Sequence, residues 1–314
     1  MPAWAYFEGQ IRPLDEARVS VRTHTFNYGT GAFGGLRGYW NSTEEELYVF
    51  RILDHYKRFL SSGRILMAQV AETPADLSAI TLELLRREGY REDCYIRPLL
   101  YKADEVIGVR LHGLRDAITI FSQPFGRYLE KEEGAKVCTS SWRRVDDTAI
   151  PPRGKLIGSY MNSALIKSEA MLNGFDEAIV LDQAGHVAEG SAENFFMVRN
   201  GTLVTPPVQS NVLEGITRNT IMHLATHVLG LPVLEREIDR SEVYYADEAF
   251  FCGTGVQVAA IASLDHRPIG TGTIGPITTQ LRDLFFRVVR GAEPDFMHWL
   301  TSVYASVQAR VEER

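Results

Sequence analysis

The chain has 314 residues, of which 45% are hydrophobic and 23% are charged, and this composition excludes a disordered or fibrous protein. At about 150 residues per domain, the length predicts two domains. The net charge of −7 argues against nucleic acid as the main partner. No apolar run approaches the roughly 18 residues that would span a membrane.

The cysteines and the first residues bear on the compartment. Cys94, Cys138 and Cys252 lie far apart, too few for a disulfide framework and without the spacing of metal ligands. The opening residues, MPAWAYFEGQ, lack the basic patch and apolar stretch of a secretory signal. We therefore expect a cytoplasmic protein that has no metal centre and binds no membrane.

The first 122 residues predict a domain of strands and helices. Alternating or continuous apolar residues predict strands at 6–11, 18–25, 47–52, 94–101 and 117–122. Helical spacing predicts one helix over 53–67. A second helix starts at Thr73, which has the position of an N-cap before Pro74 and Asp76, and ends at Gly89.

The rest of the chain predicts a larger second domain. The stretch 123–134 contains a proline, two glycines and a charge run, which is typical of a linker. Helices are predicted over 216–229 and 277–289. Strands are predicted at 178–181, from the turn at 183–186 through Val198, and at 202–205, 249–252 and 257–263. Because strands and helices do not alternate singly, an α+β fold is favoured over a doubly wound sheet.

Residues 29–34, Gly-Thr-Gly-Ala-Phe-Gly, match the G-x-G-x-x-G pattern of dinucleotide-binding loops. That loop needs a buried strand before it and a long helix after it. Here the preceding segment is polar at alternate positions, and Gly35 and Gly38 would interrupt a helix. A glycine-rich turn is favoured, and a nicotinamide-dependent oxidoreductase is kept as an alternative.

His223 and His227 stand one helical turn apart, a spacing that zinc accepts. Residue 224 is leucine rather than the glutamate of the H-E-x-x-H motif, and no third ligand accompanies the pair. A partly exposed helix face is the favoured interpretation.

Lysine is rare, with six among 33 basic residues. Arginine cannot lose its proton in a protein, so amine chemistry would have to use one of these six. Lys155 is distinctive because it lies at the edge of an apolar stretch, IPPRGKLIGSY. Burial there would lower its pKa, as Schiff-base chemistry requires; a surface loop lysine is the equally weighted alternative.

Two acids and two glycine-rich turns accompany this lysine. Glu189 and Glu193 stand within an apolar strand pattern, where a carboxylate is costly unless it is paired or has a function. The stretch 213–218, Leu-Glu-Gly-Ile-Thr-Arg, places glycine and threonine at a helix start, which can bind an anion. With the turn at 252–255, Cys-Gly-Thr-Gly, it suggests a bound phosphate.

Together these stretches resemble the branched-chain amino-acid aminotransferases of fold type IV, which use pyridoxal phosphate. The matching segments follow one another across nearly the whole chain, at 27–30, 33–37, 95–98, 150–160, 189–195, 215–218 and 253–254. The resemblance implies a two-domain α+β enzyme. Its smaller N-terminal domain would cover 1–122, an interdomain loop 123–134, and a larger cofactor-binding domain with a mixed, barrel-like sheet 135–314.

The resemblance also implies the residues that hold the cofactor. Lys155 would bind it covalently and then move a proton to and from the substrate Cα. Glu189 would bond the pyridine nitrogen and keep it protonated, and Tyr160 would bond the phenolic oxygen. The phosphate would be held by Arg58, the amides of Ile216 and Thr217, and Thr254.

The substrate contacts implied are of two kinds. The carboxylates would face Tyr95, Arg97 and the amides of Gly255 and Val256. An apolar pocket would be lined by Tyr28, Phe33, Phe125 and Tyr160. A loop near 107–110 of a partner subunit would complete this pocket, so a homodimer or larger homo-oligomer is expected, and the loop 123–134 would close over the substrate.

The expected reaction moves the amino group of L-leucine, L-isoleucine or L-valine to 2-oxoglutarate by a ping-pong mechanism, a step of branched-chain amino-acid biosynthesis. Gly34, Phe125 and Arg127 depart from the family, which usually has glutamate and often tryptophan at the first two positions. A roomier or differently charged pocket could then admit (R)-amines or aromatic amino acids. The alternatives are an (R)-amine or D-amino-acid transaminase, an aminodeoxychorismate-lyase-type enzyme, and a pyridoxal-phosphate-binding protein without turnover.

Overall fold

The computed structural model describes residues 3–126 and 134–305. The chain divides into two compact units, which we call unit 1 and unit 2. Unit 1 takes residues 1–126, 154–158 and 287–314, and unit 2 takes 127–153 and 159–286. None of the described helices is long and apolar enough to cross a membrane.

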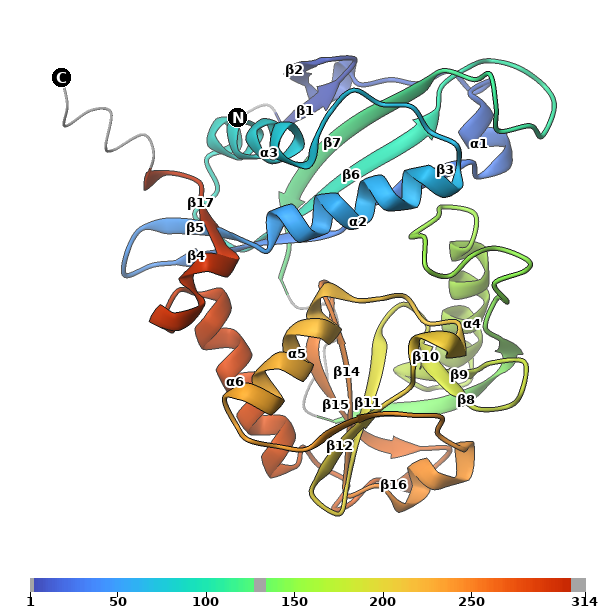
Figure 1. Ribbon diagram of the computed structural model, residues 1–314, viewed down its shortest axis with the longest axis vertical. Coiled ribbons are helices and arrows are strands. Elements are labelled where there is room, and N and C mark those ends of the chain that lie inside the picture. Colours follow the sequence, from blue (N-terminus) through green and yellow to red (C-terminus); the bar gives the residue numbers. More distant parts are fainter. Residues whose placement is uncertain (1–2, 127–133, 306–314) are drawn as a thin grey trace. The chain divides into compact units, whose positions relative to one another are not determined.

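Unit 1 is built on an eight-stranded sheet with the order β17-β5-β4-β6-β7-β1-β2, in which β3 also pairs with β6. All of its strand pairs are antiparallel. The helices α2 and α3 pack against each other and against strands of this sheet (Figure 1). The strands are β1 (Trp4–Phe7), β2 (Gln10–Pro13), β3 (Gly31–Phe33), β4 (Leu36–Asn41), β5 (Glu46–Phe50), β6 (Cys94–Lys102), β7 (Asp116–Pro124) and β17 (Leu300–Ser302). The helices are α1 (His24–Tyr28), α2 (Ile52–Ile65), α3 (Pro74–Glu88) and the short 3-10 helices η1 (Leu14–Glu16) and η4 (Pro294–Trp299).

Two strand predictions in unit 1 are wrong. The predicted strand over 6–11 is the centre of a hairpin, because Glu8 and Gly9 turn the chain with φ of 50° and 80°. The predicted strand over 18–25 is a loop that leads into helix α1. Its alternating valines misled the prediction, since Val19 and Val21 are exposed rather than packed.

The same region contains residues 29–34, for which we predicted a glycine-rich turn. Gly29 ends helix α1 in the left-handed conformation, with φ 66°. Residues 31–33 form strand β3, which pairs with β6. The segment therefore connects a short helix to a strand, without the long helix that a dinucleotide-binding loop precedes.

Unit 2 is built on a nine-stranded sheet with the order β10-β9-β8-β15-β14-β11-β12-β13, to which β16 adds beside β15. The sheet is mixed, with β8 parallel to β9 and β15, and β12 parallel to β13. The strands are β8 (Ala135–Arg143), β9 (Glu177–Leu181), β10 (Val187–Gly190), β11 (Asn194–Arg199), β12 (Thr202–Thr205), β13 (Val233–Glu235), β14 (Glu248–Gly253), β15 (Gln257–Leu264) and β16 (Arg267–Pro268). The helices are α4 (Tyr160–Leu172), α5 (Ile216–His227), α6 (Pro276–Val289), of which the last three residues belong to unit 1, and the 3-10 helices η2 (Val208–Ser210) and η3 (Arg240–Tyr245).

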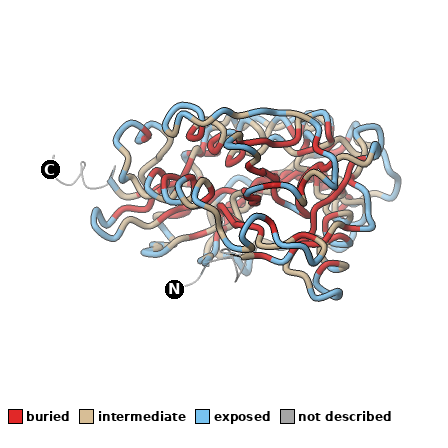
Figure 2. The backbone as a smooth tube through the Cα atoms, turned by 90° about the horizontal axis from the view of Figure 1, so that it is seen from below, coloured by how far each residue is buried: buried red, intermediate tan, exposed pale blue. Residues whose placement is uncertain are grey.

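One large hydrophobic cluster packs against most strands of the unit 2 sheet. Val187 of β10 and Val204 of β12 lie near opposite ends of the strand order, yet both belong to one cluster with residues of β8, β9, β11, β14 and β15. The sheet must curl around this cluster to bring its ends to one core, as the barrel-like prediction requires. Buried segments gather in the interior and exposed ones lie at the periphery of the tube (Figure 2).

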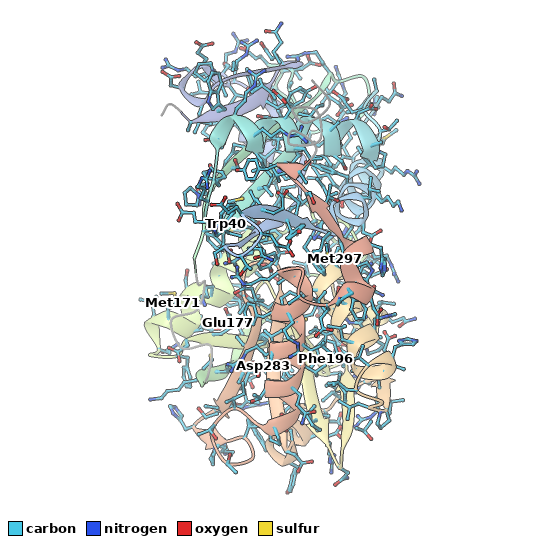
Figure 3. The ribbon with its side chains drawn as sticks, turned by 90° about the vertical axis from the view of Figure 1, so that its left-hand side faces the viewer. Trp40, Met171, Glu177, Phe196, Asp283 and Met297 are labelled. Carbon is cyan, nitrogen blue, oxygen red and sulfur yellow. The ribbon has the colours of Figure 1, made fainter. Side chains whose placement is uncertain are left out.

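Helix α6 runs beside this sheet. Figure 3 labels Asp283 on α6 and Phe196 on β11, whose ring stacks on Phe250 at a centroid distance of 5.1 Å. The carboxylate of Glu248 accepts hydrogen bonds from the amides of Ile277 and Thr278 at the start of α6, at 3.0 and 2.7 Å. A strand residue thus caps this helix.

The predicted elements of unit 2 need two corrections. The strand expected to run through Val198 is two strands, β10 and β11, because the chain bends at 191–193. Helix α4 was not predicted at all, although Ser163, Ile166 and Ala170 have helical spacing and are buried. Its exposed Met161 and Leu172 blur the apolar stripe.

The unit boundaries also differ from those expected. Residues 154–158 and 287–314 belong to unit 1 rather than to the segment 135–314. Strand β7 extends to Pro124, so 123–124 belong to a strand, while 127–133, including Arg127, lie outside the described residues. The functional division into 1–122 and 135–314 stays a prediction.

Helix α3 starts with the capping box that we predicted. Thr73 Oγ1 accepts a hydrogen bond from the Asp76 amide at 3.2 Å, and the Asp76 carboxylate accepts one from the Thr73 amide at 2.8 Å. Replacing Thr73 by alanine removes this cap, and loss of an N-cap costs about 1 kcal/mol. We expect the urea midpoint of Thr73→Ala to fall accordingly, whereas Ser61→Ala, on the exposed face of α2, should leave it unchanged. An unshifted midpoint in Thr73→Ala would contradict this assignment.

Candidate active site

Lys155 is held by its backbone in unit 1. The segment 154–158 pairs with β3: the Phe33 amide donates to Lys155 O at 2.9 Å, and the Ile157 amide donates to Gly31 O at 2.8 Å. On its other side the Lys155 amide donates to Ser62 Oγ of α2 at 3.0 Å. The Lys155 side chain is half-buried, and its Nζ lies 5.0 Å from the centroid of the Phe33 ring. The lysine is therefore not a loose surface residue.

A buried histidine of α2 lies near three cations. His55 is buried, and burial, followed by the charges of Arg58, Arg51 and Lys155, holds its pKa well below the ordinary value. The imidazole is therefore neutral, and three cations lie within electrostatic range of it. Its Nδ1 has no hydrogen-bond partner among the residues that the structure describes. One of these cations, Arg51, is paired with Asp54 at 2.8 Å. Positive groups gathered in this way suit an anionic ligand.

Four predicted substrate residues form a series of contacts that begins at Phe33, beside Lys155. The guanidinium of Arg97 lies 4.6 Å from the centroid of the Phe33 ring, and its Nη2 donates to Tyr95 Oη at 3.1 Å. The Phe125 ring packs on Tyr95 at a centroid distance of 5.2 Å. Within the described chain, the buried Arg97 Nε has no hydrogen-bond acceptor. Unit 1 thus combines an amine, a guanidinium and aromatic rings.

Tyr28 lies in a different environment of the same unit. Its hydroxyl accepts a hydrogen bond from the Gly108 amide at 3.2 Å, and its ring packs on His24 at 4.8 Å between centroids. This places Tyr28 beside the loop that carries Ile107 and Val109, both of which are exposed. Its predicted role in the apolar pocket stays a prediction.

Gly34 does not leave the space that we expected from its departure from the family. A Cβ at this position would lie 2.6 Å from Pro98 Cγ, so the proline ring already occupies the place. At Gly35 a Cβ would lie 2.2 Å from Tyr95 Oη, and glycine is what lets the tyrosine approach the backbone. The lack of a side chain at 34 therefore creates no cavity there.

In unit 2, Glu189 is only 3% exposed but well paired. Its carboxylate lies 2.7 Å from Arg144 Nη2 and accepts hydrogen bonds from Asn194 Nδ2 at 3.1 Å and the Leu213 amide at 3.2 Å. A buried carboxylate is tolerated when a cation and several donors surround it. This one can pair with a protonated ring nitrogen.

Asn194 connects the parts of this site. Its side chain bonds Glu189 and also donates to Leu213 O at 2.9 Å, while its strand pairs with Cys252 of β14. A Cβ on Gly215 would lie 2.0 Å from Asn194 Oδ1, so glycine is required at the start of α5. The acid, the helix start and the β14–β15 turn, which carries Thr254 and Gly255, therefore belong to one assembly.

The start of α5 has the features of an anion site. Gly215 is the N-cap, and within the described residues no side chain caps this end of the 12-residue helix. The amides of Ile216 and Thr217 occupy the first helical turn, where they and the helix dipole favour a negative charge. Thr217 and Val256 are buried, and Thr254 and Gly255 are half-buried.

Sequence reasoning missed several residues of these two groups. Arg144, Asn194, Ser62 and His55 were assigned no role, although Asn194 lies in the stretch that carries both acids. Arg144 and Ser62 act on residues 45 and 93 positions away, and no local pattern reports such contacts. Of the predicted residues, Arg58, Lys155, Tyr28, Phe33, Tyr95, Arg97 and Phe125 belong to unit 1, and Tyr160, Glu189, Ile216, Thr217, Thr254, Gly255 and Val256 belong to unit 2.

His223 and His227 stack on each other on α5 at a centroid distance of 4.3 Å. The His227 ring is exposed and contacts the His223 carbonyl oxygen through Nδ1 at 3.1 Å. This is the exposed helix face that the sequence favoured.

The comparisons with known proteins agree with this picture. Residues 31–264 match the family model for amino-transferase class IV. A probable branched-chain-amino-acid aminotransferase of Aquifex aeolicus is 46% identical over 301 residues, which cover 96% of this chain and 97% of that protein.

Solved structures of branched-chain aminotransferases are also similar to this chain. The branched-chain aminotransferase of the archaeon Thermoproteus uzoniensis, in complex with norvaline, has a TM-score of 0.93 at 42% identity, with 97% of this chain and 100% of that chain covered. The T.th. branched-chain amino acid aminotransferase, complexed with N-(5'-phosphopyridoxyl)-L-glutamate, has a TM-score of 0.91 at 38% identity, with 96% and 99% covered. The chain belongs to the class IV aminotransferase family, and it has the two-unit α+β architecture of fold type IV. It is an aminotransferase.

Glu193 is the second acid of the Glu189 stretch, and its environment is different. It is 4% exposed, and burial, reinforced by the charge of Glu177, raises its pKa to about 8. Glu177 itself pairs with Lys167 of α4 at 2.7 Å, at the position labelled in Figure 3. The Glu193 carboxyl therefore keeps its proton to a higher pH than an ordinary glutamate does.

This raised pKa predicts how stability depends on pH. An acid whose pKa is raised on folding contributes stability at low pH, and that contribution is lost as pH rises through the folded-state value. We expect the urea midpoint of the wild type to fall as pH rises from about 4.5, the ordinary value of a glutamate, to about 8. The fall should be much smaller in Glu193→Gln, because the amide mimics the neutral acid. Glu83→Gln, an exposed change on α3, is the control. Parallel pH profiles for the wild type and Glu193→Gln would refute the assignment.

Proposed function

We propose that the protein transfers the amino group of branched-chain L-amino acids to 2-oxoglutarate with pyridoxal phosphate as cofactor. The observation that carries this proposal is Lys155, a lysine whose backbone is bonded on two sides and whose amine lies beside Phe33. A fixed amine next to an apolar ring suits covalent chemistry with a carbonyl compound. Membership of class IV and the names and ligands of the relatives support it.

The donor groups fit this cofactor. Arg58 and the amides of Ile216 and Thr217, with Thr254, would hold the phosphate, since a guanidinium and helix-start amides suit a dianion. Glu189, kept in place by Arg144 and Asn194, would pair with the ring nitrogen. Tyr160, the first residue of α4, would bond the phenolic oxygen.

When bound, pyridoxal phosphate supplies an aldehyde and an electron-withdrawing ring. The chain's own contribution is to hold groups and move a proton. Lys155 Nζ would take the proton from the substrate Cα and return it. His55, whose pKa is held well below its ordinary value by burial and by nearby cations including Lys155, adds no further positive charge near the lysine.

Substrate recognition would rest on the aromatic and guanidinium groups of unit 1. Arg97 and Tyr95, already bonded to each other at 3.1 Å, would bind a carboxylate, together with the amides of Gly255 and Val256. Phe33 and Phe125 would contact an apolar side chain. One related structure contains norvaline and another an adduct of phosphopyridoxyl with L-glutamate. An apolar and an acidic side chain are the two types that this arrangement suits.

Two of the alternatives have lost support. A nicotinamide site at 29–34 lacks the helix that it requires. The (R)-amine and aromatic specificities were suggested by Gly34, Phe125 and Arg127 together, and at the first of these positions Pro98 already occupies the place of a side chain.

We further propose a cytoplasmic homodimer or larger homo-oligomer. The three cysteines are free thiols, which is typical of a reducing compartment. Ile107 and Val109 are 86% and 77% exposed, and exposed apolar residues on a loop suit insertion into a second copy.

Lys155→Ala tests the cofactor and the lysine together. The purified wild type should show a visible absorption band that shifts when leucine is added. The variant should lack the normal band and lose transamination by about 10³-fold, the order expected when a proton-transferring group is removed. The control is Lys57→Ala on α2, whose side chain is 67% exposed and which should keep both. An unchanged leucine response in Lys155→Ala would overturn the proposal.

Arg97→Gln tests the carboxylate contact. Loss of a charge-assisted hydrogen bond costs about 1.5–3 kcal/mol, so the KM for 2-oxoglutarate should rise about 10- to 100-fold. The absorption spectrum of the bound cofactor should not change. Steady-state kinetics with 2-oxoglutarate provide the measurement, and an unaltered KM would remove Arg97 from the site.

A further inference from the structure

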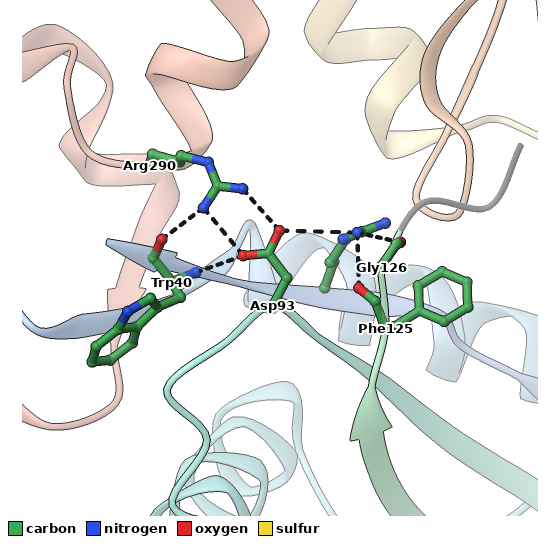
Figure 4. Close-up of polar contacts among 6 residues, drawn as sticks. Trp40, Asp93, Phe125, Gly126 and Arg290 are labelled. Carbon is green, nitrogen blue, oxygen red and sulfur yellow. Dashed lines mark hydrogen bonds and ion pairs between the residues drawn. The ribbon is translucent and has the colours of Figure 1, made fainter. Parts of the chain in front are cut away.

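Arg37 of β4 is a buried cation to which sequence reasoning assigned no role. It is 3% exposed. Its Nη2 donates to the carbonyl oxygens of Phe125 at 3.0 Å and Gly126 at 2.7 Å (Figure 4). These are the last described residues before 127–133. One guanidinium nitrogen thus holds the chain where it leaves β7.

Arg37 also contacts the Phe125 side chain. The guanidinium carbon lies 5.2 Å from the centroid of the Phe125 ring and 5.5 Å from that of Tyr39. A planar guanidinium can donate to carbonyls and pack on aromatic rings at the same time, which an ammonium cannot do equally well. The backbone and the ring of Phe125 therefore depend on the same side chain.

Asp93 holds Phe125 from a second direction. Its backbone oxygen accepts a hydrogen bond from the Phe125 amide at 3.0 Å. Its carboxylate lies 3.9 Å from Arg37 Nη2 and accepts a hydrogen bond from the Trp40 amide at 2.9 Å. The Asp93 carboxylate thus compensates the charge of the buried Arg37, and its hydrogen bond with the Trp40 amide fixes the carboxylate to β4.

Arg290, which follows α6, completes the network. Its Nη1 and Nη2 contact the two Asp93 carboxylate oxygens at 3.1 and 2.9 Å, and Nη1 also donates to Trp40 O at 2.6 Å (Figure 4). The Arg290 carbonyl oxygen accepts a hydrogen bond from Asn41 Nδ2 at 2.8 Å. The network therefore joins four distant stretches of unit 1.

The network ends at groups of the candidate site. The Phe125 ring packs on Tyr95 at 5.2 Å between centroids, and Tyr95 Oη accepts a hydrogen bond from Arg97 at 3.1 Å. A displacement of Phe125 would remove the ring contact that supports Tyr95 on one side. Arg37 itself is one residue layer away from the groups expected to touch substrate.

We propose that Arg37 is a positioning residue that sets selectivity for the substrate side chain by fixing Phe125, with Asp93 and Arg290 holding Arg37. The inference rests on the proposed function, because it assigns Phe125 to the wall of the apolar pocket. When Phe125 is fixed, its ring can contact a leucine side chain and contribute binding energy. An alanine side chain is too short to make this contact. Arg37 therefore favours leucine over alanine.

The test compares wild type, Arg37→Lys, Arg37→Gln, Phe125→Ala and the double variant Arg37→Gln/Phe125→Ala, each as holoenzyme. For each we would measure kcat/KM with leucine and with alanine, the cofactor absorption band and the melting temperature. Arg37→Gln should lower the leucine-to-alanine ratio about tenfold, since loss of a few apolar contacts in a pocket changes discrimination by roughly 10- to 200-fold. The absorption band should be unchanged.

The double variant decides whether Arg37 acts through Phe125. If it does, the ratio in the double variant equals that of Phe125→Ala, because coupled residues are not additive. Arg37→Lys keeps the charge opposite Asp93 and should show a smaller fall in the ratio with a wild-type melting temperature. Arg290→Gln should lower the ratio less than Arg37→Gln. The control, Arg87→Gln on α3, removes a side chain that pairs with Glu83 at 3.1 Å and should change nothing.

Two results would overturn the inference while the proposed function stands. One is an unchanged leucine-to-alanine ratio in Arg37→Gln when Phe125→Ala lowers it. The other is a double variant whose loss is the product of the two single losses. If the wild type gives no half-reaction with any amino acid and no shift of the absorption band, the proposed function itself fails, and that failure is visible before any variant is made.

Discussion

The pairing of residues 154–158 with strand β3 is the contact on which the candidate site of unit 1 depends. It fixes the backbone of Lys155 against the strand that ends in Phe33, while Ser62 of α2 holds the other side. The Phe33 ring then lies near both the lysine amine and the Arg97 guanidinium. Because the backbone is held from two directions, binding a partner through the amine costs side-chain entropy but little further backbone entropy.

Two neighbouring buried acids of unit 2, Glu189 and Glu193, lie in opposite electrostatic environments. Glu189 has a cation and two further donors around it, whereas Glu193 lies near the charge of Glu177, and burial raises its pKa. One carboxyl is thus equipped to face a positive ring nitrogen. The other carboxyl has a raised pKa and so resists becoming a second negative charge. The difference comes from environment, since the two residues are chemically identical.

Local signals predicted local structure well. The capping box at Thr73 and Asp76 was readable because both partners lie within four residues. The strand expected over 18–25 failed because alternation alone does not show whether valines find a sheet to pack on. Helix α4 was not predicted because its exposed apolar residues obscure the helical spacing of its buried ones. The roles of Lys155, Glu189 and the other site residues were inferred from motifs and stay predictions, but the two acids proved to be buried as their apolar surroundings indicated.

The sequence by itself determined the family, the short motifs and the chemical types at the site, because these depend on residues close together in the chain. Only the tertiary structure decided that Arg144 would meet Glu189, that Ser62 would hold Lys155, and that Arg37, Asp93 and Arg290 would converge on Phe125. It also decided that Pro98 fills the place beside Gly34. Such contacts join residues tens to hundreds of positions apart, and their partners are selected by sheet order and packing, which no local pattern encodes.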